Sequence, residues 1–409
     1  MADKPLQGIR VADFTHILAG PYCTLLMAMA GADVIHIQSL TQEDISTRPP
    51  AAQQDPASAR QGKDPNSTAM FNTVNLNKRA IRLDLHRSEA VALAKNLVRV
   101  SDVVVENFRP GIMDRLGLGY KELYKVRPDI IMVSISMTGQ EGPEHRYGGA
   151  AVNFSALSGM GYLTSYADGI PTEVRAPMDT TDGTSACFAV LAALMHRKAT
   201  GEGQYIDVSA REAVTSFLGD IFLDYPLNQR DPQPMGNGHS YMAPHGVYPC
   251  KEEDSWIAIA VGNDAEWRSL CRAMSRPDLL DEVYFKDALV RWQHREKLDA
   301  LLADWTRSFA DVELIAYLQE AGVAAMPSFS NKELYEDRHL KERRVYHEVN
   351  HPELGRKIVL GPPFLLTDTP LDVHSPAPLL GQHNEQVFCD LLGLPREELE
   401  RLIKEQVIF

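Results

Sequence analysis

Two aspartates, Asp179 and Asp182, stand just before Gly183 and a long apolar run, in a stretch that begins RAPMDTTDGTSACFAVLAALMHRKATGEGQ at residue 175. The apolar run predicts a helix over Thr184–Arg197, followed by a terminating glycine. The free N–H groups at the start of a helix need acceptors, which Asp182, Thr181 or Asp179 could supply as an N-cap. A carboxylate held ionised by the helix dipole is also a suitable nucleophile toward an activated acyl group, and Gly183 would let a large substrate approach closely. The residues alone leave both interpretations open.

The elements that must position these aspartates alternate between strands and helices. Short apolar runs predict strands, and apolar residues at helical spacing predict the helices between them. The expected strands are Ile9–Phe14, Val34–Ile37, Ile81–Leu85, Val103–Val105 and Ile130–Ser134, and the expected helices are Tyr22–Ala30 and Ser88–Val100. This alternation predicts an α/β fold with a doubly wound, mostly parallel sheet. Ser39–Ser67, rich in Pro, Gln and Asp, predicts a long loop.

The pattern changes after Val208. A helix is expected at Glu212–Phe222, and Asn228–Pro244 is a connector rich in Pro, Gly and Asn. The sequence then predicts antiparallel strands at Val247–Cys250 and Trp256–Ala260, helices at Glu266–Met274, Arg295–Phe309 and Val312–Glu320, a return at Val323–Pro327 and a helical tail at Asn384–Gln406. These elements indicate a second, smaller α+β domain.

Composition and motifs exclude several classes of function. A chain of 409 residues with a net charge of −14 is not expected to bind nucleic acid. The five scattered cysteines lack a CxxC pair and favour free thiols in the cytoplasm, and no apolar segment is long enough for a signal peptide or a membrane span. The sequence following the first strand, THILAGP, is not GxGxxG, so no nucleotide cofactor is expected. No histidine pair has metal-ligand spacing, so no metal is expected either.

Nearly the whole chain resembles the class III CoA-transferases, the CaiB/BaiF family that includes formyl-CoA:oxalate CoA-transferase. The resemblance lies in five stretches that occur in the family's order: PLQGIRVADFTHILAGPYCTLLMAMAGADVI, NLNKRAIRLDL, DVVVENFRPGIMDRLGLGY, MDTTDG…AALMHRKATGEGQYIDVS and APLLGQHNEQVFCDLLGL. The family nucleophile is an Asp four residues before a Gly, followed by a helix and a TGxGQ turn. Asp179 has that position, which leaves Asp182 as the expected cap.

The resemblance implies a mechanism and a set of contacts to coenzyme A. Asp179 would form a mixed anhydride with the donor acyl group and then an aspartyl–CoA thioester, without metal or ATP. The family's CoA contacts correspond here to Leu83, His86, Asn107, Phe108, Arg109 and Arg115. Ser39 stands where the family has a basic residue that stacks on adenine, and Leu18 replaces a frequent glutamine. The oxalate enzyme's glycine-rich lid has no match, and Pro234–Ser240 is the nearest candidate.

The stretch GGAAVNFSALSG decides between members of the superfamily. An α-methylacyl-CoA racemase would carry a His–Asp pair where this chain has Ala150 and Ala151, and a methyl group takes no proton. The two alanines also enlarge the expected substrate pocket and make it less polar, together with Gly183 and Phe154, and with Met137, Tyr147 and Tyr241 as further candidates. Such a pocket suits a bulky, aryl-substituted acceptor such as benzylsuccinate, with succinyl-CoA as the donor.

The resemblance also implies the architecture. Residues 1–220 and 330–409 would form a discontinuous CoA-binding domain, and residues 225–330 the small domain. Two chains of the family thread through each other, so an interlocked dimer is expected, either a homodimer or a heterodimer with a homologous subunit. A non-catalytic partner subunit is a third interpretation, which the presence of Asp179 disfavours.

Overall fold

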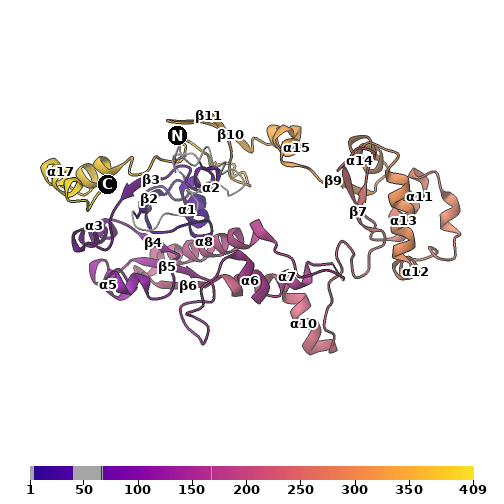
Figure 1. Cartoon of the computed structure of the whole chain (residues 1–409), viewed down its shortest axis with the longest axis horizontal. Coiled ribbons are helices and arrows are strands. Elements are labelled where there is room, and N and C mark those ends of the chain that lie inside the picture. Colours follow the sequence, from indigo (N-terminus) through magenta and orange to yellow (C-terminus); the bar gives the residue numbers. More distant parts are fainter. Residues whose placement is uncertain (1–3, 40–65, 67, 167) are drawn as a thin grey trace, which may run out of the picture. The chain divides into compact units, whose positions relative to one another are not determined.

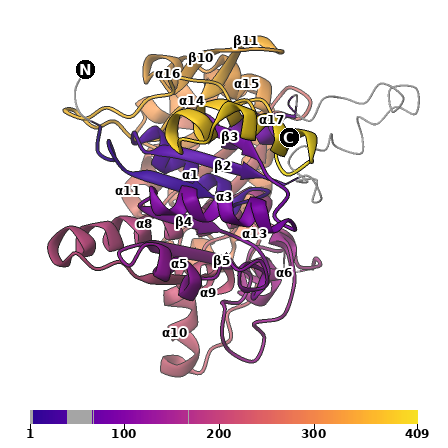
Figure 2. The ribbon, with the colours of Figure 1, turned by 90° about the vertical axis from the view of Figure 1, so that its left-hand side faces the viewer.

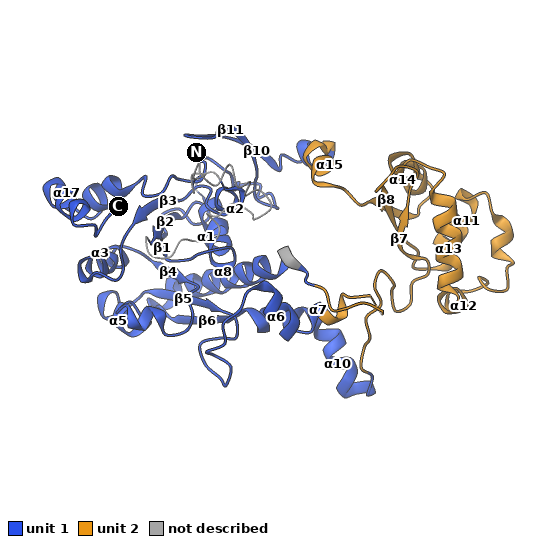
Figure 3. Ribbon diagram, in the orientation of Figure 1, with its two compact units in different colours: residues 1–161, 173–230, 339–409 blue, residues 162–172, 231–338 orange. Residues whose placement is uncertain are grey.

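The computed structural model describes residues 4–39, 66, 68–166 and 168–409 and divides the chain into two compact units. Unit 1 comprises residues 1–161, 173–230 and 339–409, and unit 2 comprises residues 162–172 and 231–338 (Figure 3). Most of the predicted loop Ser39–Ser67 lies outside the described residues.

Unit 1 is built on a six-stranded sheet in the order β3-β2-β1-β4-β5-β6, in which every neighbouring pair is parallel. The predicted parallel α/β sheet is therefore confirmed. Figure 2 shows β3, β2, β4 and β5 following one another across the unit. The strands are β1 Arg10–Asp13, β2 Asp33–Gln38, β3 Arg79–Arg82, β4 Val103–Glu106, β5 Ile131–Ser136 and β6 Tyr205–Ser209.

The helices of unit 1 lie between and beyond these strands. They are α1 Ala19–Met29, α2 Ala69–Val74, α3 Ser88–Arg99, α4 Ile112–Arg115, α5 Tyr120–Val126, α6 Ala151–Leu157, α8 Arg175–Thr200, α9 Ala210–Thr215, α10 Gly219–Asn228 and α17 Arg396–Lys404. A short helix, α7 Met160–Leu163, and another, α16 Arg338–Glu342, lie at the changes from one unit to the other.

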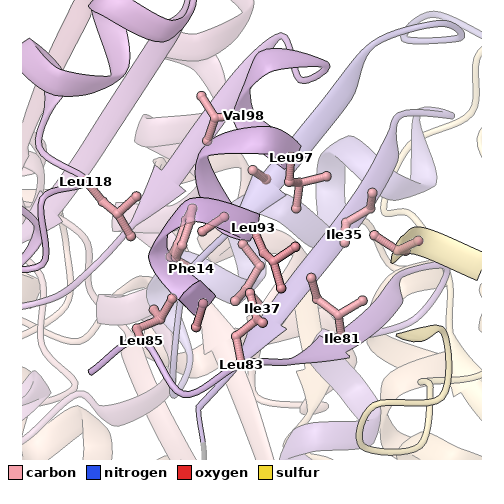
Figure 4. Close-up of a cluster of buried hydrophobic side chains, with 14 of the residues drawn as sticks. Phe14, Ile35, Ile37, Ile81, Leu83, Leu85, Leu93, Leu97, Val98 and Leu118 are labelled. Carbon is pink, nitrogen blue, oxygen red and sulfur yellow. The ribbon is translucent and has the colours of Figure 1, made fainter. Parts of the chain in front are cut away.

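The sheet is buried on both faces because its strands are almost wholly apolar. Val104 of β4 joins one core cluster, whereas Val103 and Val105 join another, as the period-two alternation of a strand requires. Helices α3, α5 and α17 cover the first face, and α1 and α8 cover the second (Figure 1). Figure 4 shows Leu93 and Leu97 of α3 among the strand residues Ile35, Ile37 and Ile81 of the first cluster.

Helix α8 begins nine residues before the predicted start at Thr184. Pro177 is its third residue, a position where the missing N–H is not needed by the helix, so this proline does not end the helical segment. The N-cap is Val174, which makes no side-chain capping bond. The prediction that Asp182 caps the helix is therefore wrong, since both aspartates lie inside α8. The predicted C-terminal glycine, Gly201, does adopt the left-handed conformation that ends a helix.

Several other elements differ from those predicted from the sequence. The single helix predicted at Glu212–Phe222 is divided into α9, a 3₁₀ turn at Ser216–Leu218, and α10. The predicted helical tail is a π-helical turn at Gln386–Leu391 followed by α17, with Gly393 (φ +74°) between them. Strand β6 and the antiparallel hairpin β10 Tyr346–His351 with β11 Gly355–Leu360 were not predicted.

Unit 2 has its own core around an antiparallel sheet, in the order β7-β8-β9. Its elements are β7 His245–Pro249, β8 Trp256–Ala260, α11 Asp264–Ala273, a 3₁₀ turn at Pro277–Leu280, α12 Ala288–Gln293, α13 Arg295–Thr306, α14 Asp311–Glu320, β9 Ala324–Pro327 and α15 Asn331–Glu336. A buried guanidinium, that of Arg291, donates to Asp264 (2.6 Å) and lies over the ring of Trp267. The segment Pro234–Ser240 is held within this unit, since the Gly236 N–H donates to Ser165.

Two features are absent from the described part of the chain, a membrane-spanning helix and a cluster of metal-binding side chains. Among the described residues, no helix combines the length and apolar character needed to cross a bilayer. Over the same described ranges, no group of three or more His, Cys, Asp or Glu side chains is arranged to hold a metal ion.

Candidate active site

A cavity of about 190 Å³ lies where the strand order reverses between β1 and β4. In an open parallel sheet this switch point is where loops leave in opposite directions and open a crevice for a ligand. Its walls come from the loops after β1, β4 and β5, the start of α6, the residue Ala210 and helix α8. The lining includes Leu18, Asn107, Phe108, Arg109, Met137, Tyr147, Ala150, Ala151, Phe154, Asp179 and Asp182.

Asp179 is half-buried in this cavity, in the second turn of α8. Burial, followed by repulsion from Glu173, raises the pKa of its carboxyl above the ordinary value. Burial therefore opposes the effect of the helix dipole, which was expected from the sequence to favour the ionised form. A desolvated carboxylate makes fewer hydrogen bonds with water and is the more reactive nucleophile.

Asp182 lies one helical turn further along α8 and lines the same cavity. Its side chain is fully buried, and neither carboxyl oxygen has a hydrogen-bond partner among the described residues. Burial, followed by the nearby Asp179, raises the pKa of Asp182 to about 8. Asp182 is therefore mainly protonated at neutral pH, in contrast to a capping carboxylate.

Asn107 fixes the position of the loop after β1. Its side-chain oxygen accepts the N–H of His16 (2.8 Å), and its amide nitrogen donates to the carbonyl of the same residue (2.8 Å). The ring of Phe108 lies 5.2 Å from the ring of His16. The side chain of Asn107 thus joins the two loops that flank the switch point, and a glycine, Gly20, provides the space for it.

A buried ion pair between Asp13 and Lys78 stabilises the start of the loop after β1. Asp13, at the end of β1, accepts hydrogen bonds from the hydroxyls of Thr15 (2.5 Å) and Thr24 (2.6 Å). The ammonium group of Lys78 lies 3.2 Å from the carboxylate of Asp13, and both side chains are fully buried. The sequence analysis did not identify this pair. The signal that could have indicated it is Asp13, a charged residue at the end of an otherwise apolar stretch.

Two glycines before α6 bring polar and apolar side chains close to the cavity. A Cβ on Gly148 would lie 2.7 Å from the guanidinium carbon of Arg109, and a Cβ on Gly149 would lie 2.2 Å from the sulfur of Met137. Any larger residue would displace these side chains. The spacing GGAA therefore serves close packing against Arg109 and Met137 as well as a small-residue wall.

A second cavity, of about 1000 Å³, shares Arg109 and Pro110 with the first. It is lined by four basic side chains that form no ion pair with any described residue: Arg109, Arg115, Lys121 and Arg146. Three acids, Glu106, Asp114 and Glu141, also line it. Burial raises the pKa of Glu106 to about 7, which reduces the negative charge opposing the basic groups. The sequence analysis did not identify Lys121 and Arg146 as site residues, because an isolated charged residue forms no recognisable sequence pattern.

Four predicted site residues lie outside both cavity linings. Leu83 is fully buried in the core, where it bridges to Ile408, and His86 is exposed beyond the end of β3. Gly183 faces α1, and a Cβ there would lie 2.5 Å from the carbonyl oxygen of Ala19. The close packing of α8 against α1 thus requires a glycine at position 183. This corrects the expectation that Gly183 makes room for the substrate. Tyr241 lies in unit 2.

Comparison with known proteins extends over almost the whole chain. A sequence model described as CoA-transferase family III matches residues 6–384. The chain is 32% identical over 406 residues to succinyl-CoA–D-citramalate CoA-transferase of Chloroflexus aurantiacus, with 99% of this chain and 98% of the relative covered. It is 34% identical over 389 residues to succinyl-CoA:mesaconate CoA-transferase of Haloarcula hispanica, with 94% and 95% covered.

Two further likenesses concern assembly and fold. The chain is 31% identical over 411 residues to the succinyl-CoA–L-malate CoA-transferase β subunit of Chloroflexus aurantiacus, with 99% of this chain and 98% of the subunit covered. The crystal structure of a CAIB/BAIF family protein from Brucella suis superposes with a TM-score of 0.84 at 27% identity, and covers 95% of this chain and 100% of that one.

Proposed function

This chain belongs to CoA-transferase family III, and from that premise we propose that it moves coenzyme A from succinyl-CoA to an acceptor carboxylic acid, with Asp179 as the nucleophile. The proposal rests on the position of Asp179, which lines the cavity at the β1/β4 switch point together with Asn107 and Phe108. CoA is a substrate, and the proposed reaction uses neither a metal nor a nucleotide cofactor.

The proposed reaction needs only exchanges at acyl carbon. The carboxylate of Asp179 attacks the thioester carbonyl, the C–S bond breaks, and CoA leaves as the thiolate. The thiolate then attacks the aspartyl carbonyl of the mixed anhydride and releases the donor acid. The acceptor carboxylate attacks the resulting aspartyl thioester and expels the CoA thiolate, which gives a second mixed anhydride. The thiolate then attacks the acceptor acyl carbon of this anhydride, forming the new acyl-CoA and releasing the carboxylate of Asp179. Each bond that breaks is replaced by one of similar energy, and water must be kept from the anhydrides because it would hydrolyse them.

The donor and acceptor are proposed from the relatives and from the cavity. The relatives described above are named for succinyl-CoA, with citramalate, mesaconate and malate as the other acids. The wall formed by Ala150, Ala151 and Phe154 is apolar beside Asp179. We therefore favour a dicarboxylic acceptor that carries an apolar substituent, including an aryl group as in benzylsuccinate. Turnover restricted to oxalate or formate, in a panel of acids tested with succinyl-CoA and acetyl-CoA, would contradict the apolar-pocket argument.

The larger cavity is the proposed site for the phosphates of CoA. A polyanion needs unpaired cations, and Arg109, Arg115, Lys121 and Arg146 supply them despite the acidic composition of the chain. Because Arg109 and Pro110 line both cavities, a ligand could extend from the phosphate groups to the thioester beside Asp179. Phe108 and the segment around Asn107 would lie along its path. The family resemblance also implies contacts between CoA and Leu83, His86 and Ser39, where Ser39 has the position of a basic residue in the family. These three contacts are proposed from the resemblance alone.

Unit 1 is proposed as the CoA-binding domain and unit 2 as the small domain, within an interlocked dimer. Helix α10 buries none of its residues within the described chain, and Phe222 and Leu227 are exposed on it. The partner is either a second copy or a homologous subunit, an arrangement for which the α and β subunits of the malate enzyme provide a precedent. A racemase function is not proposed, because Ala150 and Ala151 offer no acid–base group in the cavity.

The nucleophile is tested by trapping. Asp179→Asn keeps the size of the side chain but removes the attacking oxygen pair, so we expect CoA transfer to fall to background while folding and CoA binding persist. Hydroxylamine added to the wild-type protein with succinyl-CoA should label one peptide, the one that contains Asp179, and borohydride should reduce the same residue. Substantial transfer by Asp179→Asn, or a label on another acid, would overturn the proposed function.

A further inference from the structure

Asp182 is a second carboxyl group in the transfer cavity to which the exchanges at Asp179 assign no role. It is fully buried, and both of its oxygens lack a hydrogen-bond partner among the described residues. A buried polar group without a partner costs free energy, on the order of 1–3 kcal/mol, and a ligand in the cavity that hydrogen-bonds to Asp182 would offset this cost.

The surroundings of Asp182 determine which ligand that is. Most of the cavity lining is apolar, with Ile17, Leu18, Ala19, Phe154 and Ala210 among its walls. The titratable side chains of the lining are Asp179 on the same helix, Arg109 after β4 and Tyr147 before α6. Helix α1, which packs against α8, carries two titratable side chains, Tyr22 and Cys23.

The balance of these groups favours the protonated form of Asp182. Arg109 is exposed and forms no ion pair with Asp182, whereas Asp179 lies one turn away and repels a second negative charge. Burial is the larger cause, and together the two raise the pKa to about 8. At pH 7 the cavity therefore offers an O–H donor at Asp182 beside the carboxyl group of Asp179.

We propose that Asp182 acts in the transfer reaction as a neutral carboxylic acid, donating a hydrogen bond to the acyl oxygen of the substrate while Asp179 attacks the adjacent carbon. This inference rests on the function proposed above. The same donor would hold the carboxylate of the released donor acid and of the incoming acceptor, because each acyl oxygen occupies the same position in turn.

The proton and the electrons balance without any further reactant. When Asp179 attacks, the electron pair of the C=O bond moves onto the acyl oxygen, and the O–H of Asp182 stabilises the charge that develops there. The C=O bond re-forms as the C–S bond breaks, and the thiolate leaves with the electron pair. Asp182 keeps its proton throughout, so the group is a hydrogen-bond donor and never a general acid. A neutral carboxyl group in an apolar site is suited to this task because its proton is not lost to water.

Two substitutions separate hydrogen-bond donation from bulk. Asp182→Leu keeps the branched shape of the side chain, in a larger volume, and removes the donor, so we expect kcat to fall about 10²–10³-fold, as when one oxyanion donor is lost. Asp182→Asn keeps an N–H donor that does not ionise near neutral pH, so its kcat should stay within about tenfold of wild type. Circular dichroism and CoA binding verify that each variant is folded.

The pH profile gives a readout that a purely structural role would not produce. Wild-type kcat should fall as the pH rises through about 8, because Asp182 then loses the donated proton and adds a second negative charge. Asp182→Asn should lack this alkaline limb. The infrared C=O stretching band of protonated carboxyl groups should be weaker in Asp182→Asn than in the wild-type protein at pH 7, and the band that remains should include that of Glu106.

The outcomes also distinguish this inference from the proposed function. Wild-type kcat in Asp182→Leu, or an unchanged alkaline limb in Asp182→Asn, would overturn the role of Asp182 while Asp179→Asn remained inactive. Activity retained by Asp179→Asn would instead overturn the nucleophile itself.

Discussion

At the scale of single residues, two aspartates of identical chemistry are separated by their surroundings. Asp179 is half-buried, and Asp182, three positions later, is fully buried without a partner. The sequence could identify the pair and, through the family spacing, the nucleophile. It could not predict the state of Asp182, because burial depends on α1, α6 and the loop after β4, which meet only in the folded chain.

The raised pKa of Asp182 predicts a pH dependence of stability. The unfolded carboxyl titrates near 3.8, and the folded one near 8, so between these values the native state holds a proton that the unfolded state has lost. The buried, protonated carboxyl group therefore destabilises the folded protein least below about pH 4. The free energy of unfolding then falls as the pH rises from about 4 to about 8. Since one pKa unit corresponds to about 1.4 kcal/mol, even part of the shift amounts to several kcal/mol.

Asp182→Asn removes this dependence. Thermal unfolding of both proteins should show that the Tm of the variant relative to wild type increases by several degrees between pH 5 and pH 8. A constant difference in Tm over that range would mean that Asp182 is ionised in the folded protein.

Arg115 offers a test of the larger cavity. It is exposed, makes no ion pair with any described residue and lines the cavity with Arg109 and Lys121. If it binds a phosphate of CoA, Arg115→Ala removes one charge-assisted contact, worth about 1.5–3 kcal/mol, and the KM for succinyl-CoA should rise about tenfold or more. Arg99→Ala, an exposed arginine on α3 outside both cavity linings, is the control and should leave KM unchanged. Equal KM values in the two variants would place Arg115 on an inert surface.

At the scale of elements, the site depends on the contact between α1 and α8. Gly183 is buried against the carbonyl of Ala19 and the N–H of Cys23, one turn after Asp179. The position of the nucleophile is thus set by how closely two helices approach. The apolar strands were predictable because both faces of the sheet are buried, as in β4. The hairpin β10–β11 was not, because Glu348 and Lys357 interrupt its apolar pattern and most of its residues stay partly or fully exposed.

Gly183→Ala should therefore separate the two helices. A Cβ only 2.5 Å from backbone oxygen cannot be accommodated without moving α1 or α8, and such overpacking costs about 1–3 kcal/mol. We expect a lower Tm and a lower kcat, because α8 carries Asp179. Gly219→Ala is the matched control: this glycine begins α10 with no atom within 4 Å of a new Cβ, so the change should be neutral or slightly stabilising. Equal Tm values for the two variants would show that the α1–α8 contact is not tightly packed.

At the scale of the whole molecule, apolar side chains remain uncovered on unit 1. Phe188 and Met195 on α8 are 73% and 75% exposed, and they lie on the same helix as Asp179. Phe222, Leu223 and Leu227 are exposed on α10, which extends away from the sheet (Figure 2). A single chain rarely leaves so many large apolar residues in water, and contiguous patches of this kind mark protein–protein contacts. These residues gave no sign of exposure in the sequence, where the apolar period of α8 and α10 predicts ordinary buried helices.

We propose the interlocked dimer from these exposed apolar residues together with the family resemblance. We expect a particle of twice the 45.5 kDa chain mass, or a complex with one homologous subunit, by light scattering and native mass spectrometry. Two threaded chains cannot part without partial unfolding, so dilution to nanomolar concentration should leave the dimer intact, and dissociation should coincide with loss of secondary structure. Phe188→Asp places a charge on the uncovered face and should prevent assembly, giving unfolded or aggregated chains. Folded, stable monomers recovered from the wild-type protein by dilution would contradict interlocking, because interlocked chains cannot separate while they remain folded.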